Sequence, residues 1–136
     1  MSNNRSWGLT VLRVVIGIVF LMHGWQKMFG FKIPGVVGMM TAMGFPLPGV
    51  SAVLITLVEL LGGIALILGV GTRVAAALLA FSMFVAIVKV HLPHGFFAQG
   101  GGYEYPLSLM AACICLALAG AGAASMDGAL ATKKPA

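Results

Sequence analysis

Four long apolar stretches constrain the fold of this chain more than any other feature of its sequence. They cover approximately residues 8–28, 50–70, 72–92 and 103–122. Each is close to the roughly 20 mostly apolar residues that a helix needs to cross the hydrocarbon core of a bilayer. A soluble domain of 136 residues, 60% hydrophobic and only 8% charged, has no single core able to bury so much apolar surface. The sequence therefore predicts an all-α integral membrane protein, one four-helix bundle domain over residues 1–136.

The connections between these spans are short, except for the first. Within residues 29–48, the Met-rich piece at residues 36–45 is too short to span and is expected to form a short helix in the membrane interface. The second and third spans follow each other almost directly, which predicts a tight helical hairpin. Thr72 is the expected N-cap of the third span.

Basic residues are unevenly distributed between the two ends of the predicted bundle. With four spans, both termini share one side, which holds Arg5, Arg73, Lys133 and Lys134; the other side holds Lys32, with Lys27 and Lys89 near the membrane edge. This bias predicts a multi-pass membrane protein with both termini in the cytoplasm. The net charge of +5 follows from the same bias. It does not indicate nucleic acid binding, because no basic patch is interleaved with aromatic residues.

Ionisable residues inside the predicted spans are the second strong feature, since they are costly in lipid and usually mark a function or a buried pair. At a rise of about 1.5 Å per residue, Glu59 falls near the midplane and Arg13 in the cytoplasmic half. The outer half or its rim holds the remaining candidates: His23, Lys27, Lys89, His91, Tyr103 and Glu104.

Small residues recur at helical spacing on the same faces as these charges. On the first span they are Gly17 and Gly24; on the second, Gly62, Gly63 and Gly69; on the fourth, Ser108, Ala111, Cys115, Ala119 and Gly122. Small residues let membrane helices approach closely. We therefore expect all three faces, with their polar groups, to point into the bundle.

Each charge also has a structural interpretation. Arg13 and Glu59 are suited to an ion pair that fixes the register of two helices, as well as to a site. Lys27 and Lys89, taken singly, are typical of side chains that extend to the interface. His23 alone is typical of a satisfied interior histidine. The combination of a buried acid with histidines, lysines and tyrosines nevertheless favours a site.

The cysteines and histidines favour neither a disulfide nor a metal. His91 and His94 are three residues apart, but Lys89 lies among them and only Glu104 is spaced to complete a ligand shell. Cys113 and Cys115 are two residues apart on a helix and face opposite sides, which disfavours a bond between them. Both are expected to be small apolar fillers.

An ordered set of motifs resembles the DoxX family of small four-helix bacterial membrane proteins. The motifs are Arg13-x-x-x-Gly17-x-x-Phe20-x-x-His23-Gly24-x-x-Lys27, Glu59-x-x-Gly62-Gly63, Gly69-x-x-Thr72-Arg73, Gly102-x-Glu104-x-Pro106-Leu107 and Gly120-x-Gly122-x-x-Ser125-x-Asp127. The resemblance implies a location in the bacterial inner membrane and a redox association. The family is named after a membrane subunit linked to thiosulfate oxidation with quinone as acceptor, and other relatives are associated with oxidative-stress and thiol-redox complexes.

These observations favour a quinone-reactive membrane subunit of a larger respiratory or thiol- or sulfur-oxidising complex. The expected donors and proton relay are Glu59, His23, Lys89 and Glu104; the expected quinone-binding residues are Arg13, Lys27, His91, Tyr103 and Phe84. Phe20, Phe96 and Phe97 are expected to join Phe84 in walling an apolar slot. Two alternatives remain: a non-enzymatic membrane anchor or assembly factor for a partner protein, and, more weakly, a small transporter, which in a homo-oligomer would have more spans.

Overall fold

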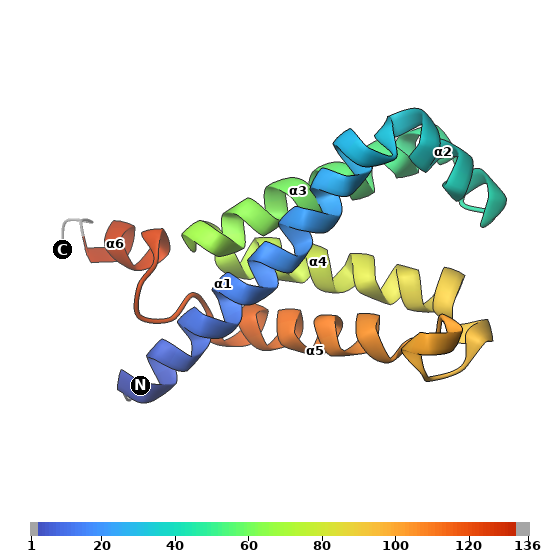
Figure 1. Cartoon of the computed structure of the whole chain (residues 1–136). Coiled ribbons are helices and arrows are strands. Elements are labelled where there is room, and N and C mark those ends of the chain that lie inside the picture. Colours follow the sequence, from blue (N-terminus) through green and yellow to red (C-terminus); the bar gives the residue numbers. More distant parts are fainter. Residues whose placement is uncertain (1–2, 133–136) are drawn as a thin grey trace.

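The computed structural model describes residues 3–132, which form helices joined by short turns, and it places no strand in this range (Figure 1). The predicted all-α class is therefore confirmed. The α-helices of this range are α1 (Asn3–Trp25), α2 (Lys32–Ala42), α3 (Pro48–Leu68), α4 (Thr72–Ala86), α5 (Glu104–Ala119) and α6 (Met126–Thr132). Two π-helical turns, η1 (Gln26–Gly30) and η2 (Ile87–His91), follow α1 and α4, and two short 3-10 turns, η3 (Leu92–His94) and η4 (Ala98–Gly100), lie in the last long connection.

Three of the helical segments are long and apolar enough to cross a membrane: Asn3–Gly30, Pro48–Leu68 and Thr72–His94. They agree with the first three predicted spans. The fourth apolar helix, α5, has only 16 residues, or about 24 Å of rise. It is shorter than predicted because Gly120 and Gly122 adopt positive φ and end the helix. A fourth complete crossing therefore stays a prediction.

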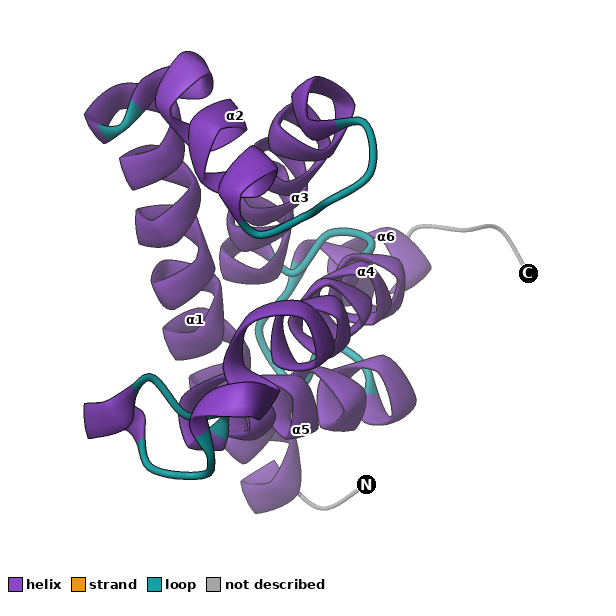
Figure 2. Ribbon diagram, turned by 90° about the vertical axis from the view of Figure 1, so that its right-hand side faces the viewer, coloured by secondary structure: helices purple, strands orange, loops and turns teal. Residues whose placement is uncertain are grey.

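The helices associate in two antiparallel pairs. Helix α1 packs along α3, α4 packs along α5, and the α3–α4 hairpin connects the pairs (Figures 1 and 2). Gly69 and Gly71 make that hairpin possible, since both have positive φ. The end of the bundle with the N-terminus, the hairpin and α6 is called the terminal end here. The opposite end, with α2 and the 95–103 connection, is called the loop end.

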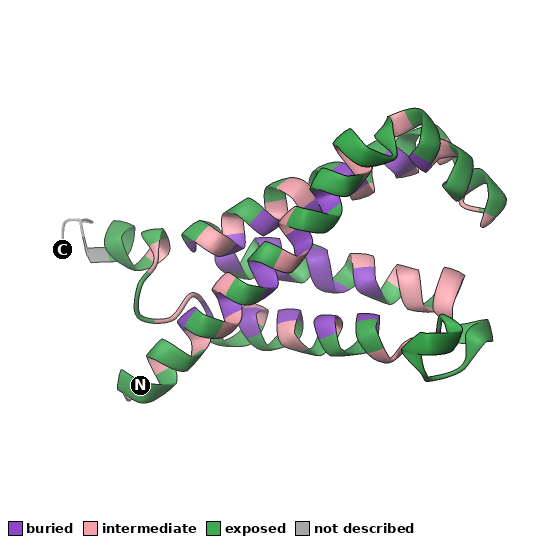
Figure 3. Ribbon diagram, in the orientation of Figure 1, coloured by how far each residue is buried: buried purple, intermediate pink, exposed green. Residues whose placement is uncertain are grey.

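The apolar core lies between the two pairs and is concentrated in the middle and at the terminal end (Figure 3). Its buried members are Ile16, Phe20, Leu66, Ala75, Ala76, Leu79, Ala80, Met83, Leu109, Cys113 and Leu116. A separate small core of Val36, Met40 and Ala52 holds α2 against α3. Phe20, predicted to wall a ligand slot, is thus a packing residue. The short helix expected at residues 36–45 is α2, and it begins four residues earlier.

Glycines bring α1 and α3 into backbone contact. A Cβ atom at Gly17 would lie 2.9 Å from the Gly63 carbonyl oxygen, and one at Gly24 would lie 2.5 Å from the Leu60 backbone nitrogen. Any larger residue at these positions would force the helices apart. The small-residue faces predicted on the first and second spans therefore do meet inside the bundle.

The small-residue face predicted on the fourth span points the other way. Ser108, Ala111, Cys115 and Ala119 are all exposed, whereas Pro106, Leu109, Cys113 and Leu116 are buried. The prediction was wrong because α5 packs on α4 through the face with Leu109, Cys113 and Leu116, and both faces of this apolar helix are compatible with lipid. Cys113 and Cys115 do lie on opposite faces, and only Cys113 fills the core.

Candidate functional site

The central feature of the candidate site is an ion pair between α1 and α3, deep in the apolar bundle. The Lys27 ammonium lies 2.7 Å from the Glu59 carboxylate, and their side chains are only 17% and 5% exposed. Glu59 points at the first helix because it shares the buried face of α3 with Thr56 and Gly63. The predicted pairing of Glu59 with Arg13 is therefore wrong: Lys27 occupies that position, about 20 Å farther along the first helix than Arg13.

Both lysines of the predicted site lie in π-helical turns. Lys27 belongs to η1, and Lys89 and His91 belong to η2. Such turns are rare, arise as single insertions in α-helices and are frequent at functional sites. Both occur where the first and third spans approach the loop end. The periodicity of the sequence did not reveal them, because one wider turn barely changes the apolar pattern.

His23 is held in one orientation on the exposed side of α1. Its Nδ1 atom lies 2.8 Å from the carbonyl oxygen of Val19, and its ring is 6.4 Å from that of Tyr105. A carbonyl oxygen can only accept, so Nδ1 carries the proton of the neutral ring. Nε2 is then the atom that accepts a proton from a bound molecule.

The other predicted residues of the loop end form a cluster that organises the 95–103 connection. His91 Nδ1 donates to the Gly101 carbonyl oxygen at 2.8 Å, and a Glu104 carboxylate oxygen accepts from the Ala98 N–H at 2.7 Å. The Tyr103 ring meets the Phe96 ring edge to face at a centroid distance of 5.5 Å. These three residues therefore shape a loop, and none of their recorded contacts reaches the Lys27–Glu59 pair.

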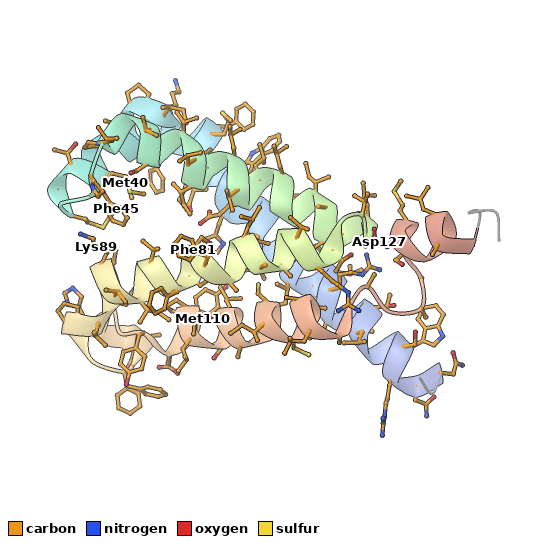
Figure 4. All side chains as sticks on the ribbon, turned by 180° about the vertical axis from the view of Figure 1, so that it is seen from behind. Met40, Phe45, Phe81, Lys89, Met110 and Asp127 are labelled. Carbon is orange, nitrogen blue, oxygen red and sulfur yellow. The ribbon has the colours of Figure 1, made fainter. Side chains whose placement is uncertain are left out.

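Lys89 connects the two helix pairs at the loop end. Its ammonium lies 6.0 Å from the centroid of the Phe45 ring, on the connection between α2 and α3 (Figure 4). At that distance a cation–π attraction is modest. Phe84 is 53% exposed on α4, and Phe97 is 72% exposed in the 95–103 connection. The structure therefore does not gather the predicted aromatic residues around one slot.

Arg13 belongs to a different site, at the terminal end. Its guanidinium is 1% exposed and donates to four backbone carbonyl groups. The acceptors are Leu66 and Ile67 at the end of α3, at 2.7 and 3.1 Å, Ala121 at 2.9 Å, and Ala124. The last two lie in the segment of residues 120–125, called the strap here, which joins α5 to α6. Arg13 therefore holds α1, α3 and the strap together.

Asp127 completes the terminal end by capping α4 from a distance. Its carboxylate accepts hydrogen bonds from the backbone N–H groups of Gly71 and Thr72, at 2.8 and 2.9 Å (Figure 4). The predicted N-cap role of Thr72 is wrong, since its hydroxyl group is buried without a hydrogen-bond partner and Gly71 precedes the helix. Partial burial alone would raise the pKa of Asp127, but the bonds from Thr72 and Gly71 and the charge of Arg13 outweigh it and lower that pKa.

We expect Asp127→Ala to destabilise the bundle by about 1 kcal/mol, the usual effect of losing a helix cap. Because the folded-state pKa is lowered, the contribution of Asp127 is complete above its ordinary value of 3.8 and disappears as the pH falls through the lower folded-state value. Denaturation by SDS at fixed lipid content measures the change, with the exposed Ser108→Ala as control. Equal unfolding midpoints for Asp127→Ala and the wild type at pH 7 would contradict the capping role.

Histidine, cysteine and acidic side chains do not gather in groups of three or more able to hold a metal anywhere in the described part of the chain. The ionisable and polar candidate residues instead divide between the buried Lys27–Glu59 pair, His23 on the exposed side of α1, the loop-end cluster and the terminal-end network.

Comparisons with known proteins agree with this architecture. The sequence model of the DoxX family matches residues 8–92, which include most of α1, all of α2 to α4 and both π-helical turns. A Bacillus subtilis (strain 168) protein named "Putative oxidoreductase CatD" is 32% identical over 113 residues, covering 80% of this chain and 78% of its own length. An uncharacterised protein of Haemophilus influenzae (strain ATCC 51907 / DSM 11121 / KW20 / Rd) is 33% identical over 108 residues, covering 79% of this chain and 73% of its own length. No solved structure matches the chain significantly.

The family match covers the part of the chain that contains the Lys27–Glu59 pair, His23 and Arg13, and ends before the loop-end residues Tyr103 and Glu104. It also agrees with the apolar helices, which identify a membrane protein. The chain therefore belongs to the DoxX family of membrane proteins.

Proposed function

We propose that this protein is a quinone-reactive subunit of a larger respiratory or thiol- or sulfur-oxidising complex in the bacterial inner membrane. The observation that carries the proposal is the Lys27–Glu59 ion pair, buried between two membrane helices beside a π-helical turn. Charges at such depth are expensive and usually serve a function. A name containing "oxidoreductase" for the Bacillus subtilis relative supports a redox role.

In the proposed reaction, the residues of this chain bind the quinone and transfer protons, and they carry no electrons. Reducing a quinone to a quinol takes two electrons and two protons. Two thiols that become a disulfide release the same number of each, so the exchange balances. Lys27 donates a hydrogen bond to the Glu59 carboxylate at 2.7 Å, and His23 offers a further acceptor through Nε2. We propose that a partner subunit or a small thiol or thiosulfate supplies the electrons.

The proposed location rests on the charges of the chain and on its relatives. Both named relatives are bacterial. Arg5 and Arg73 lie at the terminal end, while Lys32 lies at the loop end, with Lys27 and Lys89 in the turns that lead to it. Lys133 and Lys134, which were predicted to share the side of the termini, lie outside the described residues. The positive-inside rule then places the terminal end in the cytoplasm and the Lys27–Glu59 pair in the outer half of the membrane.

Native mass spectrometry of the full-length protein, gently extracted from membranes in mild detergent, tests this proposal. We expect a mass that corresponds to a bound isoprenoid quinone or to a redox partner subunit. An unrelated small helical bundle of similar size, extracted from the same membranes, controls for quinone that is carried along with lipid. A bare homo-oligomer with ordinary phospholipid alone would contradict the proposal.

The second candidate is a non-enzymatic anchor or assembly factor, and one observation favours it. The two deeply buried ionisable side chains, Arg13 and Glu59, are each fully engaged with other parts of the bundle. Both sets of contacts join α1 to α3, as expected if the charges only fix helix register. The double replacement argued in the Discussion separates this function from the first.

A further inference from the structure

A groove lies on the exposed side of the first helix, where its residues flank Lys27 in the sequence. It has a volume of about 520 Å³ and is lined by Met22, His23, Trp25, Gln26, Phe29 and Gly30. These residues span the end of α1 and the π-helical turn η1. Trp25, Met22 and Phe29 are all more than half exposed, so the groove opens toward lipid. Apart from His23, no residue pattern in the sequence predicted this groove, because it depends on the wider turn of η1.

The polar groups of the groove are few and well placed. His23 has its Nδ1 atom bound to the Val19 carbonyl oxygen, which leaves the Nε2 lone pair for a ligand hydroxyl group. Gln26 is exposed at the same groove, and its amide offers both a donor and an acceptor. A six-membered ring with two oxygen substituents on opposite sides has suitable partners for both residues: one oxygen can donate to His23 Nε2 and the other can bind the Gln26 amide.

The apolar walls of the groove are suited to a flat ring. The Trp25 and Phe29 rings lie 4.4 Å apart at an interplanar angle of 49°, so they form a tilted aromatic pair beside His23 and Gln26. Small-molecule sites combine such apolar walls with a few polar groups that orient the ligand. The opening toward lipid gives a long apolar tail a place to lie.

The groove shares the π-helical turn η1 with Lys27 of the buried pair. Lys27 follows Gln26 directly in the π-helical turn, yet it points to the other side of the helix, where it pairs with Glu59. Two consecutive residues of one turn therefore face different partners: Gln26 faces the groove and Lys27 faces Glu59.

We propose that this groove binds the head group of a quinol, with one hydroxyl group donating to His23 Nε2, the opposite oxygen bound by the Gln26 amide and the ring against Trp25 and Phe29. This assignment rests on the proposed function, and it places the binding site on the lipid-facing side of α1, apart from Lys89, His91, Tyr103, Glu104 and Phe84. His23 and Gln26 are the specificity-determining residues.

Tryptophan fluorescence offers a direct test, because the chain has two tryptophans and they are matched reporters. Trp7 is 50% exposed and Trp25 54%, and they lie on the same helix, about 27 Å apart along its axis. Trp7→Phe leaves Trp25 as the reporter in the groove, and Trp25→Phe leaves Trp7 as the control for quinone dissolved in lipid. The full-length variants are placed in nanodiscs and titrated with decylubiquinol and decylubiquinone.

We expect saturable quenching of Trp25 and only gradual, non-saturating quenching of Trp7. His23→Leu and Gln26→Leu, each in the Trp7→Phe background, are expected to raise the quinol concentration needed for half-maximal quenching about tenfold. A tenfold change is equivalent to the loss of one good hydrogen bond. His23→Leu is expected to affect the quinol more than the quinone. Circular dichroism confirms that each variant is folded.

The outcomes separate the groove from the proposed function. Saturable Trp25 quenching that is insensitive to both His23→Leu and Gln26→Leu would overturn the groove as the binding site. Equal, non-saturating quenching of both tryptophans would also overturn it. If native mass spectrometry of the same samples then still shows bound quinone, the proposed function stands and the site lies elsewhere; if it shows none, both proposals fail.

Discussion

Arg13→Leu is expected to destabilise the folded protein by about 3–5 kcal/mol, the largest effect of any single replacement considered for the terminal end. The guanidinium of Arg13 is fully buried and supplies hydrogen-bond donors to carbonyl groups of Leu66, Ile67, Ala121 and Ala124. The last carbonyl groups of a helix have no partner within it, so the end of α3 depends on such a donor. Leucine fills part of the space but supplies none of these four hydrogen bonds.

Arg73 is a matched control for this prediction. It also donates to carbonyl groups at the end of a helix, those of Ala117 and Leu118 in α5, but it is exposed, so water can replace it. Arg73→Leu is therefore expected to cost about 1 kcal/mol or less. Unfolding by SDS in mixed micelles measures the loss of stability in Arg13→Leu and in Arg73→Leu.

Arg13→Lys extends the test to a variant that keeps the charge. The stability of Arg13→Lys is expected to lie between those of the wild type and Arg13→Leu, because one ammonium group cannot reach all four carbonyl oxygens. If Arg13→Leu were no more destabilising than Arg73→Leu, the role of Arg13 as the organiser of the terminal end would be refuted.

A double-mutant cycle on Lys27 and Glu59 is expected to show strong coupling. Lys27→Met or Glu59→Leu alone leaves one charged group buried without its partner, which costs about 3–5 kcal/mol. The double replacement removes both charges and is expected to lie within about 1 kcal/mol of the wild type, since apolar side chains of similar size often substitute for a buried pair without loss. The same SDS unfolding assay measures all four proteins. Additive effects would mean that the 2.7 Å contact contributes nothing.

The double variant also separates the two functions, because it removes the proton-carrying groups without unfolding the bundle. For a quinone-reactive subunit, we expect assembly with the partner to be retained and quinone-linked turnover to fall by at least about tenfold, the low end of the effect of losing an acid–base group. For an anchor, both assembly and turnover would be retained. Leu118→Ala, at a position 74% exposed on α5, controls for general effects of mutation.

Much of the site could be predicted only as a set of residue types. The sequence identified Glu59, Lys27 and His23 because ionisable groups are conspicuous in apolar helices. It paired Glu59 with the wrong cation, since Lys27 and Arg13 share similar spacing to glycines on one helix and only the crossing of α1 over α3 decides which of them faces the carboxylate. It included Asp127 in a family motif but gave it no role, because Asp127 reaches the N-terminus of α4 from α6, far away in the chain.

The sequence by itself determined the environment of this protein and the type of its main elements. Apolar stretches of bilayer length leave few alternatives to membrane helices, because every backbone polar group must be satisfied within the helix in lipid. The glycines of the first two spans likewise indicated where helices meet. These properties are local or periodic, so they can be derived from residues close together in the chain.

Only the tertiary structure decided which face of α5 is buried, which cation Glu59 holds and where the strap lies. The physical reason is the same in each case. In a chain this apolar, both faces of a helix are compatible with lipid or with a neighbouring helix, so hydrophobicity does not choose between them. The choice depends on shape and on hydrogen bonds between distant segments: glycines that admit a neighbouring backbone, and a buried arginine that requires four carbonyl groups.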